Sequence, residues 1–409
     1  MSITQAMERD AFRFDPFGTE FREDPERFHA DLFAHSPGFM SMEGVPSAYV
    51  ATHAQCCSVL RDFKTFSSAK PAGLPGMERI DFFNGLPVMN YSDPPDHTRR
   101  RKVVNPAFTP RRTEALIEGT SARADAVLDR ITVDRSEFEV LGEFAKPLVA
   151  ETLLSDFMQI APDDHSIFID YVATLPLLDR LRPGDPKPPE YLAAWERGRE
   201  FCRRQQELAR QGQCDNLVGL IADSAEGGAI DDNEMMAMMI VLLIGGVGTV
   251  AGALGATMLT LAGVPGAVER ILQEPDAASR HLEETLRLHP PVSLVMRFAT
   301  ADADVGGKLI SAGTPVYALI ATACHDPDVF ADPYEFDIDR PNLKDHIAFG
   351  YGMHTCIGNS ITRNLVPMLL RKIADRFPRL RLAGDDGGIV WDTSTPRARH
   401  VGRLVVSFR

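Results

Sequence analysis

The alternation of hydrophobic and polar residues predicts helices separated by short strands. Residues SMEGVPSAYVATH (41–53) alternate apolar and polar positions around a Gly-Val-Pro turn, which is typical of a strand pair. From about Pro110 to Met258 the pattern is mainly helical, and RRTEALIEGTSARADAVLDRI (111–131) predicts one helix in that region.

The longest apolar stretch, MMAMMIVLLIGGVGTVAGALGATMLTLAGV, predicts one long helix. It starts after Ile230 with Asp231 or Asp232 as its cap and ends at Gly263 before Pro265, so it exceeds about thirty residues. Its many glycines and its place in mid-chain, without a basic flank, favour a buried helix over a membrane span.

The last third of the sequence mixes both patterns. A helix is predicted from Asp276 to Leu288, because the two prolines of HLEETLRLHPP prevent its continuation. RFATADADVGGKLISAGTPVYALIATA (297–323) predicts β segments separated by glycines, and a last long helix begins at or near Cys356 and ends at about Phe377. Without repeats or long linkers, residues 1–409 are expected to form one mainly α domain with small peripheral sheets.

Composition excludes some functions. With 43 Lys and Arg against 57 Asp and Glu, the net charge is −14, which argues against nucleic acid or an anionic membrane as the main partner. The N-terminus, MSITQAMERDAFRFDPFG, shows no leader pattern. The six cysteines include no CxxC pair, so a reducing cytoplasm is the expected location.

Residues 349–358, FGYGMHTCIG, combine three glycines, a histidine and a cysteine before a predicted helix. A cysteine in the first turn of a helix meets the positive end of the helix dipole, which favours the thiolate, a metal ligand. Glycines at 350, 352 and 358 allow the backbone to approach a flat, bulky group. The alternative is a glycine-rich turn with a structural cysteine.

This segment resembles the haem-ligand loop of the cytochrome P450 family, FGxGxHxCxG, at every fixed position. The matching residues are Phe349, Gly350, Gly352, His354, Cys356 and Gly358. The resemblance implies a P450 fold that holds haem b (iron protoporphyrin IX) between the long central helix and this loop. Cys356 would be the iron ligand whose electron density favours O–O cleavage, and His354 would lie near a haem propionate.

Two further segments support the resemblance. In HLEETLRLHPP, Glu284 and Arg287 lie three residues apart, a pair that is weak by itself because surface ion pairs are common. They match the ExxR pair of the family, and Arg340 in EFDIDRP matches its third member. The resemblance implies a buried structural role that is needed for haem retention.

In DPPDHTRRR, His97 and Arg101 lie four residues apart on one helix face. Alone, this run would indicate a solvated basic surface. Its similarity to the family's DPPxHTxxR segment implies instead that both residues bind haem propionates. Arg297 in LVMRFAT resembles a third propionate-binding residue, and His354 would complete the set.

The long helix departs from the family pattern. In LLIGGVGTVAGAL, Gly245 and Gly246 match the glycines that approach the haem and Thr249 matches the threonine on the oxygen side, but Gly248 replaces the usual aspartate or glutamate. A second departure is Asn364, which comes directly after Arg363 at a position where the family often has a glutamate. This difference is expected to affect packing.

Thr249 therefore lacks a neighbouring low-pKa group that exchanges protons with solvent. Three explanations stay open. Protons pass through water in the space left by Gly248, assisted by a carboxylate or histidine from elsewhere; or turnover is slow or uncoupled; or the acid was replaced in this chain.

Apolar residues occupy the three segments that line the family's substrate pocket. Each is by itself more typical of the core, but as a set they indicate an apolar, medium-sized ligand such as a terpenoid, aromatic or alkyl compound. The segments contain Phe82, Phe83, Val88 and Met89, then Val241, Leu242 and Ile244, then Val292, Leu294, Val295 and Met296. No anchor for a substrate carboxylate is evident in these segments, although Arg79 lies in a loop that could provide one.

The resemblance implies a monomeric monooxygenase that hydroxylates a small apolar compound with O₂. Electrons would come from an iron–sulfur ferredoxin and its NAD(P)H-dependent reductase, with Arg111, Arg112 and Arg371 as a candidate docking patch. The alternatives are a peroxide-driven or non-hydroxylating enzyme of the same type and a haem-binding sensor without turnover. Retained Thr249 argues against the sensor.

Overall fold

The computed structural model of the chain describes residues 12–409, apart from 13, 17, 43, 72–82, 179–180, 182–184, 214–216, 227 and 396–397. Phe82, Arg79 and Cys214 lie outside the described residues. Two compact units are formed, one by Met1–Ser67, Ser121–Pro147 and Thr249–Arg409, here called unit 1, and one by Ser68–Thr120 and Leu148–Gly248, here called unit 2.

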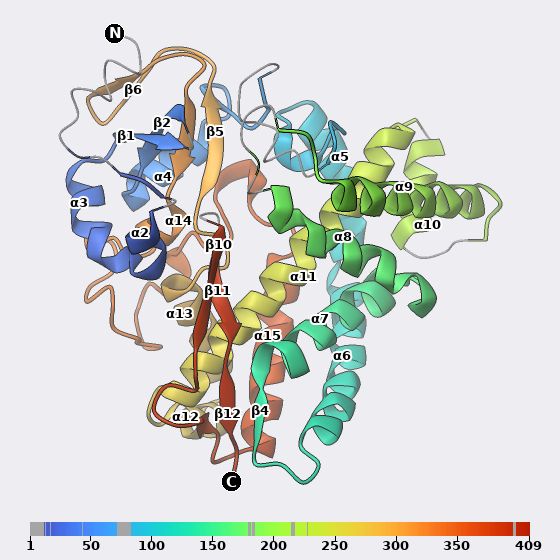
Figure 1. The fold of residues 1–409 in the computed structure, drawn as a ribbon, viewed down its shortest axis with the longest axis vertical. Helices are drawn as coiled ribbons and strands as arrows, with labels where there is room; N and C mark the ends of the chain where they lie inside the picture. Colours follow the sequence, from blue (N-terminus) through green and yellow to red (C-terminus); the bar gives the residue numbers. More distant parts are fainter. Residues whose placement is uncertain are drawn as a thin grey trace. The chain divides into compact units, whose positions relative to one another are not determined.

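Helices dominate the described residues, as the sequence predicts (Figure 1). The α-helices are α2 (Thr19–Glu23), α3 (His29–Ala34), α4 (His53–Arg61), α5 (Asp96–Val104), α6 (Pro110–Ile131), α7 (Lys146–Glu151), α8 (His165–Leu178), α9 (Pro189–Arg210), α10 (Leu217–Glu226), α11 (Asp232–Gly263), α12 (Ala267–Gln273), α13 (Ala277–Leu288), α14 (Ile320–Ala323) and α15 (Asn359–Arg376). Short 3₁₀ turns are η1 (Pro25–Phe28), η3 (Met89–Tyr91), η4 (Asn105–Phe108), η7 (Pro162–Asp164), η8 (Leu343–Asp345) and η9 (Gly352–His354), and π-helical turns are η5 (Val140–Ala145) and η6 (Thr152–Phe157).

The strands form small separate sheets. They are β1 (Gly38–Met42), β2 (Val45–Val50), β3 (Phe66–Ser67), β4 (Glu137–Glu139), β5 (Val295–Ala299), β6 (Ala303–Val305), β7 (Lys308–Ile310), β8 (Pro315–Ala318), β9 (Arg381–Leu382), β10 (Val390–Thr395), β11 (Ala398–Arg403) and β12 (Val405–Ser407). The largest sheet has the order β1-β2-β8-β5-β3, a second has the order β4-β12-β9, and β6-β7 and β10-β11 are hairpins. The predicted strand pair is confirmed as β1 and β2, which pair antiparallel.

The largest sheet of unit 1 is buried on both faces. Successive residues of a strand point to opposite faces, so Ala48 and Val50 of β2 join a core with α4, whereas Tyr49 and Ala51 join a second core with α3. The β segments predicted after Arg297 are confirmed as β5 to β8, but residues 320–323, predicted as β, form α14. Pairing with β2 ends at Leu319, whose N–H donates to Val50 O at 2.9 Å.

Helices α12, α13 and α15 pack together in unit 1, and α15 contacts the end of α6. The predicted helix from Asp276 to Leu288 is confirmed as α13, with Asp276 at its N-cap. Lys372 of α15 donates to Asp125 of α6 at 2.6 Å.

Unit 2 contains the helices α5, α8, α9 and α10 and the first part of α11. Aromatic residues join α8 to α9, with Phe168 and Phe201 at 4.8 Å between ring centroids and Tyr171 beside Tyr191 and Trp195. Amphipathic α9 buries this face, because apolar side chains recur every three or four residues.

The long central helix is confirmed as α11, which continues from unit 2 into unit 1. Its start is a capping box, in which Glu234 N–H donates to Asp231 Oδ1 at 2.7 Å and Asp231 N–H to Glu234 Oε2 at 3.0 Å. Among the described residues, Asn233–Gly263 is the one helix long and apolar enough to cross a membrane, and 61% of its most apolar window is buried. A core helix has the same properties.

Candidate functional site

The loop from Phe349 to Gly358 is closed by its own backbone. Cys356 N–H donates to Phe349 O at 2.8 Å, and both Gly350 and Gly352 have φ of +73°, a conformation that favours glycine. A Cβ atom on Gly352 would lie 2.8 Å from the carbonyl oxygen of Leu60 in α4. The glycine therefore allows the loop to pack directly on that helix.

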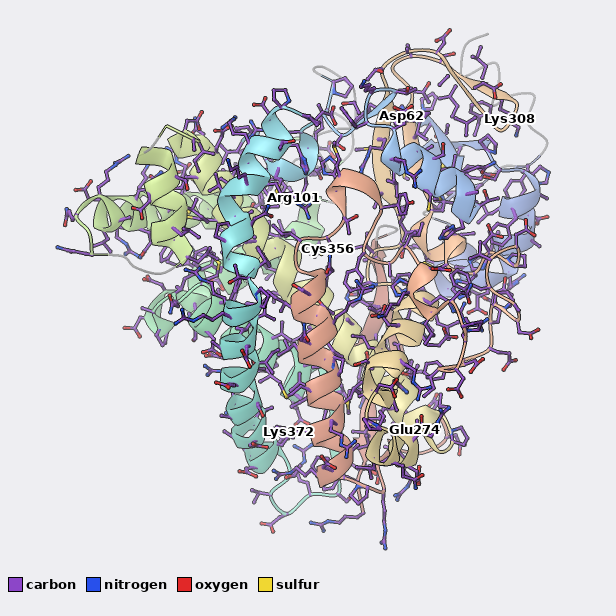
Figure 2. All side chains as sticks on the ribbon, turned by 180° about the vertical axis from the view of Figure 1, so that it is seen from behind. Asp62, Arg101, Glu274, Lys308, Cys356 and Lys372 are labelled. Atoms are coloured by element: carbon purple, nitrogen blue, oxygen red, sulfur yellow. The ribbon has the colours of Figure 1, made fainter. Side chains whose placement is uncertain are left out.

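Cys356 carries its thiol at the surface of this loop, at the end of α15 that lies away from Lys372 (Figure 2). Of the described cysteines, Cys56, Cys202 and Cys324 are buried and Cys57 is partly buried, whereas Cys356 is exposed. An exposed thiol in a glycine-containing loop could bind the metal of a planar group that covers the loop.

The prediction that Cys356 lies in the first turn of the helix is wrong. Helix α15 begins at Asn359, with Gly358 at its N-cap. The Asn359 side chain donates to Cys356 O at 2.7 Å, which closes a turn before the helix starts. The sulfur nevertheless lies near the start of the helix, because a Cβ atom on the N-cap residue Gly358 would lie 3.9 Å from Cys356 Sγ.

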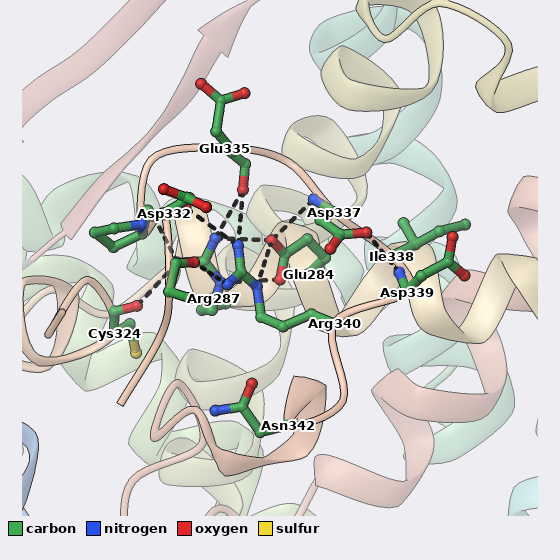
Figure 3. Close-up of polar contacts among 12 residues, drawn as sticks. Glu284, Arg287, Cys324, Asp332, Glu335, Asp337, Ile338, Asp339, Arg340 and Asn342 are labelled. Atoms are coloured by element: carbon green, nitrogen blue, oxygen red, sulfur yellow. Dashed lines mark hydrogen bonds and ion pairs between the residues drawn. The ribbon is translucent and has the colours of Figure 1, made fainter. Parts of the chain in front are cut away.

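Glu284, Arg287 and Arg340 form the predicted buried cluster (Figure 3). Glu284 accepts two hydrogen bonds from Arg287, at 2.7 and 2.9 Å, and one from Arg340 at 3.3 Å. Glu284 and Arg287 have no exposed surface and Arg340 is 7% exposed.

Backbone groups satisfy the rest of this cluster. The Arg287 guanidinium donates to the carbonyls of Cys324 and Pro333 at 3.1 and 2.7 Å, and Asp337 N–H donates to Glu284 at 3.1 Å. The three side chains therefore hold the irregular segment 324–340 against α13.

A second network, which the sequence reasoning missed, starts from the neighbouring Glu283. This buried carboxylate accepts from Arg363 Nε and Nη2 at 2.7 and 3.0 Å and lies 2.9 Å from His346 Nε2. His346 Nδ1 accepts from Ala348 N–H at 3.2 Å, so Nε2 carries the proton that is donated to Glu283. The Arg363 guanidinium lies 4.5 Å from the ring centre of Phe349, the first residue of the loop.

Electrostatics in this network favour the charged carboxylate. Burial opposes ionisation, but hydrogen bonds from His346 and Arg363 outweigh it and lower the pKa of Glu283 to about 2. Asn364, the second departure from the family pattern, is exposed and donates to Ser360 O at 2.6 Å, which is a local contact within α15. The network thus ties α13, α15 and the loop together.

The middle of α11 is open on one side. Gly245 and Gly248 are exposed, although Leu243 and Val250 beside them are buried. A Cβ atom at Gly245 or Gly248 would meet no heavy atom within 4 Å, whereas one at Gly246 would lie 2.7 Å from Leu153 Cδ1. Gly246 is therefore a packing position, and Gly245 and Gly248 border free space.

The predicted propionate-binding residues fall in both units. Arg297 of β5 and His354 of η9 belong to unit 1, and Arg297 is 4% exposed with Nη1 donating to Met296 O at 2.8 Å. His97 and Arg101 of α5 belong to unit 2, where His97 is buried and Arg101 is partly exposed. Their shared role stays a prediction.

The other face of α5 has a structural role. Arg99 and Arg100 both donate to Glu234 of α11, with Arg99 Nη1 at 2.6 Å and Arg100 Nε at 2.8 Å. The hydrogen bond from Arg99 overcomes the opposing effect of burial and lowers the pKa of Glu234 to about 2. Arg99 and Arg100 of this basic run therefore belong to an ion-pair network with Glu234, whereas Lys102 is exposed.

The predicted substrate-pocket residues differ in exposure. Phe83, Val88, Met89, Val241 and Leu294 are buried, whereas Leu242, Ile244, Val292, Val295 and Met296 are partly exposed. A small apolar cavity of about 10 Å³ lies between α8, α9 and α11, but none of these residues lines it. Their contact with a substrate remains a prediction.

The basic residues predicted to dock a partner also differ. Arg111 and Arg112 are exposed at the start of α6. Arg371 of α15 donates to Ile271 O at 2.5 Å and lies 3.5 Å from Asp375 Oδ2. Its guanidinium therefore already has a hydrogen-bond partner and an ion-pair partner within unit 1.

Comparisons with known proteins agree with these features. The Cytochrome P450 family model matches residues 198–382. Cytochrome P450 107B1 of Saccharopolyspora erythraea is 32% identical over 75% of this chain and 73% of its own length, and Nocardicin C N-oxygenase of Nocardia uniformis subsp. tsuyamanensis is 29% identical over 94% and 96%. The crystal structure of the myxobacterial cytochrome P450 CYP267B1 in complex with myristic acid superposes with a TM-score of 0.85 at 26% identity, over 96% of this chain and 98% of that one.

Proposed function

The chain belongs to the cytochrome P450 family, and on that premise we propose that it inserts one oxygen atom from O₂ into a small-to-medium apolar compound. It is a cytochrome P450 monooxygenase whose cofactor is haem b. The observation that best supports this proposal is the exposed Cys356 thiol, which lies in a loop whose glycines allow the backbone to pack closely.

Haem b fits this loop. Cys356 would supply the thiolate ligand, since the described part of the chain offers no other exposed cysteine. When bound, the haem supplies the redox chemistry that activates O₂ for transfer of one oxygen atom. Glu283 and Glu284 anchor the loop and segment 324–340 to α13, so the thiolate is held in place before any substrate arrives.

We assign Arg297, His354, His97 and Arg101 to the haem propionates. Four residues with cationic or hydrogen-bonding side chains match two carboxylates that need such partners when buried. Thr249 supplies a hydroxyl on the open side of α11, where it can donate and accept hydrogen bonds. Gly248 leaves room for water beside it.

The proposed substrate is apolar. Phe83, Val88, Met89, Leu242, Val292, Leu294 and Val295 would line the pocket, together with Phe82. The identity of the substrate can be approached by adding small terpenoid, aromatic and alkyl compounds to the ferric protein and recording changes in its haem absorption spectrum. A compound with a carboxylate belongs in the panel because the myxobacterial relative was crystallised with myristic acid.

Electrons would come from a separate iron–sulfur ferredoxin and an NAD(P)H-dependent reductase. The protein would act in the cytoplasm as a monomer, with residues 1–409 forming a single haem domain. The test is product formation with NADPH, a ferredoxin pair and O₂. Product with this mixture supports the monooxygenase. Product with peroxide but none with the ferredoxin pair and O₂ supports a peroxide-driven enzyme, which the glycine at position 248 favours as the second candidate.

A further inference from the structure

Monooxygenation requires protons from outside the substrate. Insertion of one oxygen atom into a C–H bond, with release of the other atom as water, consumes O₂, two electrons and two protons. Residues 235–263 of α11 contain no Asp, Glu, His, Lys or Arg. If the proposed function holds, a titratable group from another element could take the place of the acid that is missing at Gly248.

Among the described residues, a titratable side chain from another element packs on α11 one turn after Gly248. Because the helix has about 3.6 residues per turn, Gly248, Thr249 and Gly252 share one face. A Cβ atom on Gly252 would lie 3.5 Å from Cβ and 3.7 Å from Cγ of His400 in β11. Cα–Cβ bonds tilt toward the helix N-terminus, so His400 packs on the side of Gly252 that faces Thr249.

His400 also has a carboxylate partner. Asp392 and His400 are opposite each other in the β10–β11 hairpin, and His400 Nε2 lies 3.4 Å from Asp392 Oδ2. Their side chains are 39% and 26% exposed. One end of the pair therefore reaches solvent, and the other end contacts the helix.

The hairpin that carries the pair is anchored on its neighbours within unit 1. Arg22 Nη1 of α2 donates to Thr393 O at 2.8 Å, and the Arg399 guanidinium lies 3.9 Å from the ring centre of Trp391. Residues 391 and 399 point to the opposite face of the hairpin from 392 and 400. The hairpin β10–β11 lies beside α11 (Figure 1), and this packing keeps His400 against Gly252.

We propose that Asp392 and His400 form a proton relay that replaces the acid missing at position 248. A proton enters from solvent at Asp392, passes to His400, and leaves the imidazole through water toward the Thr249 hydroxyl. Solvent then reprotonates the pair, so each turnover carries two protons through it and changes neither residue. The electrons come from the reductase, as in the proposed function on which this inference rests.

The first test compares two ways of driving the reaction in the holoenzyme. With NADPH, ferredoxin, reductase and O₂, His400→Gln should lower the product formed per NADPH by about tenfold or more, because a positioned proton donor contributes at least that much to rate. With hydrogen peroxide, which brings both protons and both electrons, product formation should stay at the wild-type level. His35→Gln, at a partly exposed histidine after α3, is the matched control and should change neither.

Rescue separates a relay from a structural effect. A carboxylate at position 248 meets no heavy atom within 4 Å of its Cβ, so Gly248→Asp can be built without displacing a neighbour. In the His400→Gln background it should restore the product formed per NADPH. Failure of this rescue, or wild-type coupling in His400→Gln itself, would overturn the relay.

A measurement without turnover tests the link directly. In the ferrous carbon-monoxide complex, the NMR titration of the His400 ring should shift when Thr249→Val removes the hydroxyl. Thr257→Val is the control, because that hydroxyl donates to Ala253 O at 2.5 Å within the helix, and it should leave the titration unchanged. An unchanged titration in Thr249→Val contradicts the relay, while the carbon-monoxide spectrum of the same sample tests the proposed haem-thiolate function separately.

Discussion

At the residue scale, two adjacent glutamates of α13 bind side chains from two different segments of the chain. Glu284 holds Arg287 and Arg340 and through them segment 324–340, whereas Glu283 holds His346 and Arg363 beside the loop of residues 349–358. Helical neighbours point about 100° apart, which lets one turn of helix reach two different segments. The ExxR motif predicts the network of Glu284 but does not predict the network of Glu283.

We predict that Glu284→Gln lowers the free energy of unfolding by about 3–5 kcal/mol, because it leaves two buried guanidinium groups without their carboxylate. Denaturant unfolding of the haem-loaded protein is the measurement. Asp125→Asn removes the partner of Lys372, which is 22% exposed, and should cost less than about 1 kcal/mol. Equal losses in the two variants would contradict the structural role of the buried cluster.

Site residues could be predicted where a short motif carries them, as with Glu284 and Arg287, but not where long-range contacts decide. Glu283 and His346 are 63 residues apart, and no local pattern joins them. The position of Cys356 relative to α15 depends on a turn closed by the Asn359 side chain, which the apolar periodicity does not reveal. The contact of Gly252 with His400 likewise exists only in the folded chain.

At the element scale, the long periodic segments were predicted well. α11 and α13 agree with the sequence prediction to within a residue, because capping residues, glycine and proline mark their ends. The π-helical turns η5 and η6 and the short helices α2 and α3 were not predicted. They are too short for a periodic signal, and tertiary contacts stabilise them.

The glycines inside helices differ in what surrounds them. We predict that Gly198→Ala, within α9 and beside the small apolar cavity, raises the free energy of unfolding by about 1 kcal/mol, since a Cβ there meets nothing within 4 Å and alanine favours the helix. Gly255→Ala in α11 should give no gain, because its Cβ would lie 2.8 Å from Cδ1 of buried Leu141. Urea unfolding of both variants tests the contrast, and a gain at Gly255 would contradict it.

At the scale of the whole molecule, unit 1 buries several histidines in their neutral form. Burial lowers the pKa of His29 to about 3, with a further contribution from His325, and lowers the pKa of His325 and of His281 to about 4, from an ordinary value of 6.5. The unfolded chain binds protons at these sites that the folded chain does not. Stability is therefore fully present above pH 6.5 and falls as the pH drops toward 4.

We predict a loss of about 2 kcal/mol for each such histidine between neutral pH and about pH 5. Urea unfolding at a series of pH values measures it. His325→Phe should flatten the dependence and His35→Gln should leave it unchanged. A wild-type free energy of unfolding that is constant from pH 7 to pH 5 would contradict this prediction.

The fold as a whole could be predicted from the order of its motifs along the chain, and the division of the described residues into two units could not. Local patterns report helices and strands, but the grouping depends on which distant segments pack together. Thus His97 with Arg101 and Arg297 with His354 were expected as one set, and they come from different units.

The central claim is that the Cys356 sulfur binds the haem iron as a thiolate. The most direct measurement is the absorption spectrum of the reduced protein under carbon monoxide. We predict a red-shifted Soret band near the wavelength that gives the family its name, its loss in Cys356→Ala, and its retention in Cys324→Ala, where the thiol is buried. A wild-type protein without this band, or a band that survives in Cys356→Ala, would contradict the account.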